Sequence, residues 1–200
     1  MPSYAIDGIV PVIDPSSYVH PSAVLIGDVI IGPGVFIGPC AVLRGDFGRI
    51  EMRKGSNLQD GCVVHSLPDF DCMIEEDGHI GHGAVIHAAH IGRNALVGMN
   101  AVVMDKAVVG EDAFVAACSF VKIGLQVPPR ALVAGIPCKV VRMLSDEEIA
   151  GKSLGTGLYH HLNARSLASM EEVQPLSAVE AQRRRVVLPK EFFPGSTELL

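Results

Sequence analysis

The chain has 200 residues, a formal net charge of −6 and no tryptophan, a length that suits one domain with an appendage. A hydrophobic content of 48% with only 5% aromatic residues predicts a core of valine, isoleucine, leucine and alanine, and so favours repetitive β structure. The acidic balance, the absence of a signal-peptide pattern and the lack of an apolar run of ~18 residues argue against nucleic-acid and membrane partners. We therefore expect a cytoplasmic protein.

Aliphatic residues recur about every six positions along most of the chain. The early positions are Ile26, Ile31, Ile37 and Leu43, and the later ones are 80, 86, 91, 97, 103, 109, 115 and 121. A helix would need spacings of three and four, and a hairpin sheet strict alternation, so neither explains this period. A hexapeptide period is the signature of a parallel β-helix, in which one aliphatic side chain of each short strand points inward. We predict this domain over residues 1–140.

The period also fixes which side chains are neighbours. Three strands form a coil of about eighteen residues, and coils stack at about 4.8 Å, the usual spacing of strands. Residues eighteen apart therefore lie directly above one another. The general rule for parallel crossovers gives a right-handed connection, so the repeat alone does not predict a left-handed helix.

The repeat fades after residue 123, and Gly135-Ile136-Pro137 indicates the last turn. Ser145 and Glu148 have the spacing of a capping box, which predicts the start of a helix within residues 141–172. Three glycines, each weakening a helix by up to about 1 kcal/mol relative to alanine, predict that it is interrupted. Its apolar residues are expected to pack against the β-helix as a stripe: Ile149, Leu154, Leu158 and Leu162. Residues 173–200 are expected to be extended or flexible.

The stretch from His79 to Gly98 holds four of the eight histidines. Alternate residues of a strand face opposite ways, so His65 and His87, which follow the inward Val64 and Ile86, both face outward. They are separated by 87 − 65 = 22 residues, which is one coil of 18 plus four residues of a loop within 66–73. The two imidazoles therefore occupy equivalent places in adjacent coils, where both can bind one Zn²⁺.

A third ligand, His82, lies one strand before His87 and round a corner of the β-helix, so it faces another direction. As a ligand it must complete the site of another copy of the chain. A cyclic trimer brings such surfaces together at every interface, which gives three sites with three histidines each and one position open for water. The other histidines are interpreted as surface or interface residues: His20, His79, His90, His160 and His161.

Two further motifs lie around His65. They are Arg44-Gly45-Asp46 and Asn57-Leu58-Gln59-Asp60. With the three histidines they resemble the gamma-class carbonic anhydrase family, most closely its branch found in phenylacetate degradation and carnitine gene clusters. The resemblance covers most of the chain, and it implies an all-β fold: a left-handed parallel β-helix with a C-terminal α-helix packed along it, assembled as a homotrimer with zinc at the interfaces.

The resemblance also implies roles for individual residues. Gln59 would hydrogen-bond the zinc-bound water, and Tyr159 would approach the metal from the C-terminal helix. Arg44, Asp46 and Asp60 would form ion pairs across the subunit contact and orient the site. For these three residues, structural pairing without a catalytic role is an equal alternative, and for Tyr159 the alternative is helix packing.

Two departures from the prototype carbonic anhydrases bear on the reaction. Those enzymes carry a glutamate directly after the Arg-Gly-Asp triplet and a proton-shuttle glutamate in an acidic loop, whereas this chain has Phe47 and offers Asp69 and Asp71. We expect a zinc hydrolase or lyase that uses zinc-bound hydroxide, with a CoA thioester of phenylacetate-type catabolism slightly favoured over CO2. The alternatives are a hexapeptide-repeat acyltransferase and a non-catalytic trimeric scaffold clipped by zinc, and Fe²⁺ or Co²⁺ remains open as the native metal.

Overall fold

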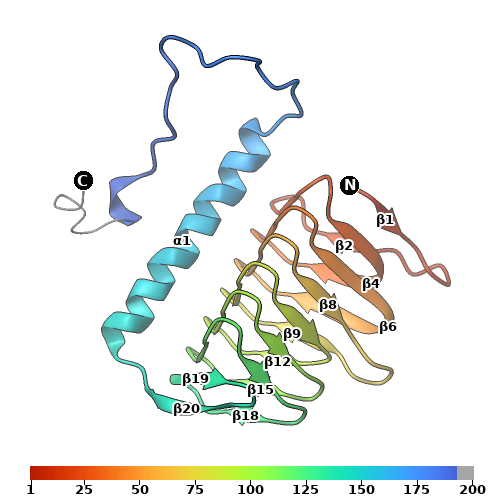
Figure 1. Ribbon diagram of the computed structural model, residues 1–200. Coiled ribbons are helices and arrows are strands. Elements are labelled where there is room, and N and C mark those ends of the chain that lie inside the picture. Colours follow the sequence, from red (N-terminus) through yellow and green to blue (C-terminus); the bar gives the residue numbers. More distant parts are fainter. Residues whose placement is uncertain (193–200) are drawn as a thin grey trace.

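The structure of the protein, a computed structural model, describes residues 1–192. Short parallel strands wind into a β-helix, whose coils are stacked from the red N-terminal strands to the green strands of the last coils in Figure 1. One sheet contains a parallel strand from each of seven coils, followed by an antiparallel last strand. The hexapeptide repeat implies that the β-helix is left-handed, as the resemblance predicts.

Two hydrogen-bonded sheets make up the three faces of the β-helix. The 8-stranded sheet contains β3 (Tyr18–Val19), β5 (Phe36–Ile37), β7 (Asn57–Leu58), β10 (His79–Ile80), β13 (Leu96–Val97), β16 (Phe114–Val115), β19 (Ala131–Gly135) and β20 (Cys138–Met143). The 12-stranded sheet bends into two faces, because its long strands β4 (Val24–Ile31) and β6 (Val42–Met52) continue from one face to the next. The second face of the β-helix contains β1 (Ser3–Tyr4), β8 (Val63–His65), β11 (Val85–His87), β14 (Val102–Val103) and β17 (Phe120–Val121). The third face of the β-helix contains β2 (Val12–Ile13), β9 (Cys72–Ile74), β12 (His90–Ile91), β15 (Val108–Val109) and β18 (Gln126–Val127).

The predicted inward positions form the core, with one exception. All eight later positions, from Ile80 to Val121, are fully buried. In the early set Ile26 faces outward, where it pairs with Arg44, while Leu25 points inward beside Leu43. Both residues are aliphatic, so composition alone could not separate them. With Leu25 in place, the early set has regular steps of six.

The capping-box prediction is confirmed. Helix α1 (Asp146–Ser169) begins after Ser145, whose hydroxyl accepts a hydrogen bond from the Glu148 backbone N–H. Glu148 in turn accepts one from the Ser145 backbone N–H, and the Arg142 guanidinium beside Glu148 lowers the pKa of its carboxyl to about 2. The helix is continuous over 24 residues, so the expected interruption at the glycines does not occur.

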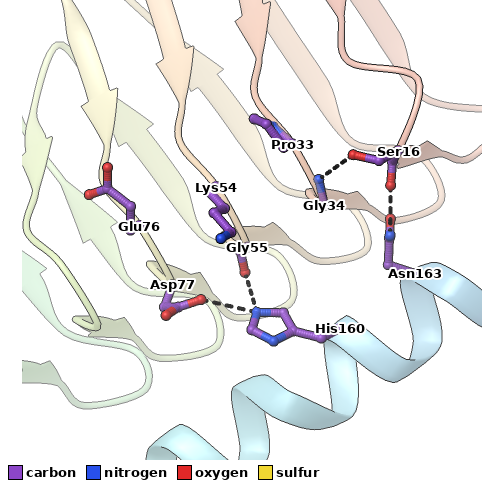
Figure 2. Close-up of a pocket in the computed structure, with 9 residues that line it drawn as sticks. All are labelled: Ser16, Pro33, Gly34, Lys54, Gly55, Glu76, Asp77, His160 and Asn163. Atoms are coloured by element: carbon purple, nitrogen blue, oxygen red, sulfur yellow. Dashed lines mark hydrogen bonds and ion pairs between the residues drawn. The ribbon is translucent and has the colours of Figure 1, made fainter.

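The predicted apolar stripe is wrong, because α1 docks through polar side chains. Lys152 donates to the Asp77 carbonyl, and Asn163 donates to the Ser16 carbonyl, both across less than 3 Å. His160 lies 2.9 Å from the Gly55 carbonyl and 3.0 Å from the Asp77 carboxylate (Figure 2). These carbonyls lie at the turns between strands, along a cavity of about 630 Å³ between α1 and the coils.

The apolar side of α1 faces the C-terminal segment instead. Leu158 and Leu162 line a depression with Val186 and Leu188, and the ring of Phe192 lies near that of His161. The described part of the tail contains one short 3₁₀ helix, η1 (Lys190–Phe192), and is otherwise mostly exposed. Residues 193–200 of the predicted tail lie outside the described residues. No helix in residues 1–192 is long and apolar enough to cross a membrane.

The His160–Asp77 pair makes the docking of α1 dependent on pH. The hydrogen bond that His160 donates to the Asp77 carboxylate raises the pKa of His160, and the same bond lowers the pKa of Asp77. A raised histidine pKa stabilises the fold below the unfolded value of about 6.5, and this contribution is lost as the pH rises through the folded value. Both side chains are almost half exposed, so we expect a small effect.

The variant His160→Gln isolates this contribution, because its amide keeps a donor for the Gly55 carbonyl but carries no charge. We expect the thermal midpoint of the wild type to exceed that of the variant by more at pH 6 than at pH 9. A difference that stays constant over this range would show that the charge of His160 does not help to dock α1.

Candidate metal centre

His65 and His87 are neighbours in adjacent coils, as the counted register predicts. They are paired residues of β8 and β11, and His65 Nδ1 lies 3.0 Å from His87 Nε2. Two nitrogens bound tetrahedrally to zinc at 2.0–2.1 Å would be about 3.3 Å apart, so a small rotation of either ring would suit a shared ion. Burial lowers the pKa of His65, which favours the neutral imidazole that a metal requires.

Each of the three predicted ligands has a carboxylate on one ring nitrogen. His65 Nε2 lies 3.0 Å from Asp46 Oδ1, and His82 Nδ1 lies 2.8 Å from Asp60 Oδ2. His87 Nδ1 pairs with Asp105 Oδ1. Metal-binding histidines almost always direct their second nitrogen to a carboxylate, carbonyl or water, which fixes the ring and increases the basicity of the ligating nitrogen. The residues therefore fit a three-histidine zinc site in their chemistry.

His82 lies apart from the other two, as predicted. It is in the turn between β10 and β11, at the corner of the β-helix, and its side chain is 46% exposed. Within residues 1–192 of one chain, no three His, Cys, Asp or Glu side chains converge as a metal-ligand group. A three-histidine site completed by His82 from a second copy of the chain stays a prediction.

The predicted acidic residues pair within the chain. Arg44 Nη1 donates to Asp46 Oδ2 across 2.7 Å, so Asp46 links the guanidinium to His65. Burial would raise the pKa of Asp46, but its hydrogen bonds with Arg44 and His65 outweigh burial and lower it. Asp60 binds His82 of the same chain, and ion pairs of these residues across a subunit contact stay a prediction.

Gln59 and Tyr159 lie on the other side of the His82 corner. Both line a cavity of about 400 Å³, here called the Gln59 cavity, with His79, His82, Leu96 and Phe114. Tyr159 packs edge-on against His79 with ring centroids 5.1 Å apart, and burial raises the pKa of its phenol to about 12. The packing alternative for Tyr159 is thus present in the structure, while its approach to a metal stays a prediction.

Two residues of this region were not predicted to take part. Asp105 belongs to no motif, but it follows His87 by 105 − 87 = 18 residues, which is one coil, so the period itself can identify it as a partner of His87. The sequence predicts a surface or interface position for His79, but the side chain is partly buried and its Nε2 lies 2.6 Å from Gln59 Nε2. Its place next to the coil of Asn57 and Gln59 follows the coil register, but no sequence period predicts its contact with Thr156 on α1.

The fold and the repeat define the class of this protein. Residues 11–45 and 88–122 match the bacterial transferase hexapeptide family, which is described as six repeats. Full-length relatives extend this match over nearly the whole chain, so the protein belongs to the hexapeptide-repeat family and, within it, to the group of the carnitine operon protein CaiE.

The CaiE proteins of Citrobacter koseri and a Proteus species are 53% and 52% identical to this chain. The alignments cover 98% and 93% of this chain and 100% and 94% of the relatives. A solved hexapeptide transferase family protein of Anaplasma phagocytophilum is 38% identical, with a TM-score of 0.78 over 80% of this chain and 95% of its own. A solved Bacillus cereus protein classed as an acetyltransferase is 31% identical, with a TM-score of 0.82 over 83% of this chain and 96% of its own.

Proposed function

We propose that the chain assembles as a cyclic homotrimer through one apolar face of the β-helix. The outward residues of this valine face form a single column of paired positions: Val42, Val63, Val85, Val102 and Phe120. Parallel sheets are normally covered on both sides, and in one chain Val63 is still 38% exposed. The equivalent column of the third face is mixed in character, with Glu51, Met73 and His90.

The edges of the valine face support a shared site. The turn with His82 forms one edge, since it joins β10 to β11, and the other edge carries His65 and His87 at the ends of β8 and β11. When three such faces meet around an axis, the His82 edge of each chain lies against the edge of the next chain that carries His65 and His87. Hexapeptide-repeat proteins are typically trimeric, which agrees with this arrangement.

We propose that His65, His87 and the His82 of the next copy hold zinc, and that the trimer is a zinc-dependent hydrolase or lyase. The observation that supports this best is the set of three carboxylates, Asp46, Asp60 and Asp105, each on one ring nitrogen of a different histidine. Zinc would polarise a carbonyl oxygen and lower the pKa of a bound water to about 7. Imidazole ligands also suit Fe²⁺ and Co²⁺, which remain alternatives.

The residues of the chain then bind substrate and position the nucleophilic water. Gln59 hydrogen-bonds the water, and Arg44, held by Asp46, adds positive charge beside His65. Phe47 is 58% exposed and its ring lies 5.3 Å from that of His65, where it forms an apolar rim. Asp69 and Asp71 are exposed on the loop after His65 and are the candidates for carrying protons to solvent.

The apolar surroundings favour an acyl substrate over CO2. Phe47 lies on one side of the proposed interface. On the other side, Leu96 and Phe114 line the Gln59 cavity. A CoA thioester brings an acyl group that buries such surface, whereas CO2 does not need it. The carnitine operon of the CaiE relatives and the phenylacetate branch of the resemblance both point to catabolism, where thioester hydrolysis has a place.

Acyl transfer is the second candidate, because the solved Bacillus cereus relative is classed as an acetyltransferase. A transferase with a histidine base has no need of three metal ligands, so the metal separates the two functions. A non-catalytic trimer with zinc as a structural clip is the third, and it predicts that chelation dissociates the trimer while no substrate is turned over.

The test is a side-by-side assay of CO2 hydration and of phenylacetyl-CoA hydrolysis, with protein that has been stripped of metal and then reloaded with zinc. We expect thioester hydrolysis that is lost on stripping and restored by zinc. Acyl transfer to an amine or hydroxyl acceptor is followed in the same samples. Turnover that survives complete metal removal would contradict the proposal and favour the transferase.

A further inference from the structure

His79 lies beside the proposed site but belongs to none of its predicted parts. It faces outward from β10, in register between Asn57 on one coil and Leu96 on the next. Its Nε2 is 2.6 Å from Gln59 Nε2, and its Nδ1 is 3.2 Å from Thr156 Oγ1 on α1. The imidazole therefore bridges the C-terminal helix and Gln59.

The partners of His79 determine which ring nitrogen carries the proton. Burial lowers the pKa of His79 to about 3, so the ring is neutral at physiological pH and has one donor and one acceptor. The amide nitrogen of Gln59 can only donate. With the amide nitrogen of Gln59 facing the ring, His79 Nε2 is the acceptor, and the proton is on Nδ1, which donates to the Thr156 hydroxyl oxygen.

Gln59 is held from two sides. Its Nε2 donates one hydrogen to His79 Nε2 and the other to Asn57 Oδ1 across 3.1 Å. Gln59 is buried, with 3% exposure, and no group within residues 1–192 donates a hydrogen bond to its carbonyl oxygen. Because Gln59 lines the Gln59 cavity with His82, the group left for a ligand is a hydrogen-bond acceptor.

We propose that His79 is a positioning residue, which binds the amide nitrogen of Gln59 so that the carbonyl oxygen is the group presented beside His82. Thr156 sets the tautomer and Tyr159 packs on the ring, so α1 supports this orientation from outside. The consequence for catalysis rests on the proposed function: the carbonyl accepts the O–H of the nucleophilic water and directs its oxygen lone pair away from Gln59. A freely rotating amide could instead donate to that oxygen and weaken the nucleophile.

Two variants separate orientation from packing. His79→Phe keeps an aromatic ring under Tyr159 but removes the acceptor, whereas the Oε1 of His79→Gln can reach the place of Nε2 and restore it. In metal-free, ¹⁵N-labelled wild-type protein we expect a ¹⁵N–¹⁵N coupling across the hydrogen bond from Gln59 Nε2 to His79 Nε2, and ring shifts of the Nδ1–H tautomer. We expect the chemical shifts of the Gln59 side-chain amide to approach those of a free amide in His79→Phe and to stay close to the wild-type values in His79→Gln.

The zinc-loaded proteins give the second measurement. Loss of an outer partner of this kind typically costs about 10–100-fold, so we expect kcat for the thioester to fall by that factor in His79→Phe, with KM little changed and most of the loss recovered in His79→Gln. The pH profile of kcat should also shift in His79→Phe, which a packing role would not cause.

The outcomes distinguish the two proposals. If the wild type binds no zinc or turns nothing over, the proposed function fails, while the NMR result still decides whether His79 orients Gln59. An Nε2–H tautomer of His79, or Gln59 signals that are identical in the wild type and His79→Phe, would overturn the positioning role. A zinc-loaded His79→Phe with wild-type kcat and pH profile would overturn its link to catalysis.

Discussion

Replacing His82 by alanine will remove the bound zinc as completely as replacing His65, although the two histidines lie on different edges of the valine face. The reason is that each site takes two ligands from one chain and the third from the next. We expect about one zinc per chain in the wild type and less than about one tenth in either variant, as measured by elemental analysis after dialysis. Catalysis should be lost in parallel.

A matched control is available in the same coil. His90 faces outward from β12 on the third face, where it lies 2.9 Å from a Glu75 carboxylate oxygen. Because this face is not part of the proposed interface, His90→Ala should keep its zinc. Full zinc in the His82 variant, or equal loss in the His90 variant, would refute the shared site.

Mixed trimers test the sharing directly. His82→Ala retains an intact His65 and His87 pair, while His65→Ala retains an intact His82. Neither variant alone can complete a site, but an interface between the two in the right order contains all three ligands. Refolding them together in equal amounts should therefore restore about a quarter of the sites, because half of the chains supply each intact edge. No recovery in correctly assembled trimers would mean that each site lies within one chain.

The sequence predicts the β-helix well because one inward residue in every six carries the same requirement. Ile80, Ile86 and Ile91 have to fill the same narrow interior, so their pattern is simple and repeats. The docking of α1 follows a different physical rule. The turns of the coils expose backbone carbonyls, such as those of Gly55 and Asp77, that need donors. The helix therefore turns a polar side to the coils, and a search for an apolar stripe finds the wrong side.

The same contrast holds for the site. Register places His65 beside His87 and would also have placed Asp105, since all three depend on the coil period. The role of His79 depends on Thr156, which is 77 residues further along the chain. Contacts between the repeat and a segment outside it have no common period, so only the structure reveals them.

Replacing Gly98 by alanine will destabilise the β-helix by about 3 kcal/mol, at the upper end of the usual cost of overpacking. Gly98 follows the inward Val97, and a Cβ atom there would lie 2.5 Å from the backbone nitrogen of Ala117 and 2.8 Å from the carbonyl oxygen of Val115. Both contacts are backbone atoms of the next coil, which is held by the hydrogen bond from the Gly98 N–H to the Val115 carbonyl across 2.8 Å. No side chain can rotate to make room, so the coils themselves must separate.

The thermal midpoint should fall by about 6–12 °C in Gly98→Ala, since about 1 kcal/mol corresponds to 2–4 °C in a chain of this size. The control is Gly151→Ala in α1, where a Cβ meets nothing within 4 Å and alanine should stabilise the helix by about 1 kcal/mol. The two substitutions add the same methyl group, so opposite signs would assign the loss to the coil contact. A midpoint for Gly98→Ala within about 2 °C of the wild type would instead show that adjacent coils can separate at little cost, and the counted register at His65 and His87 would then fix the ligands less rigidly than the shared site requires.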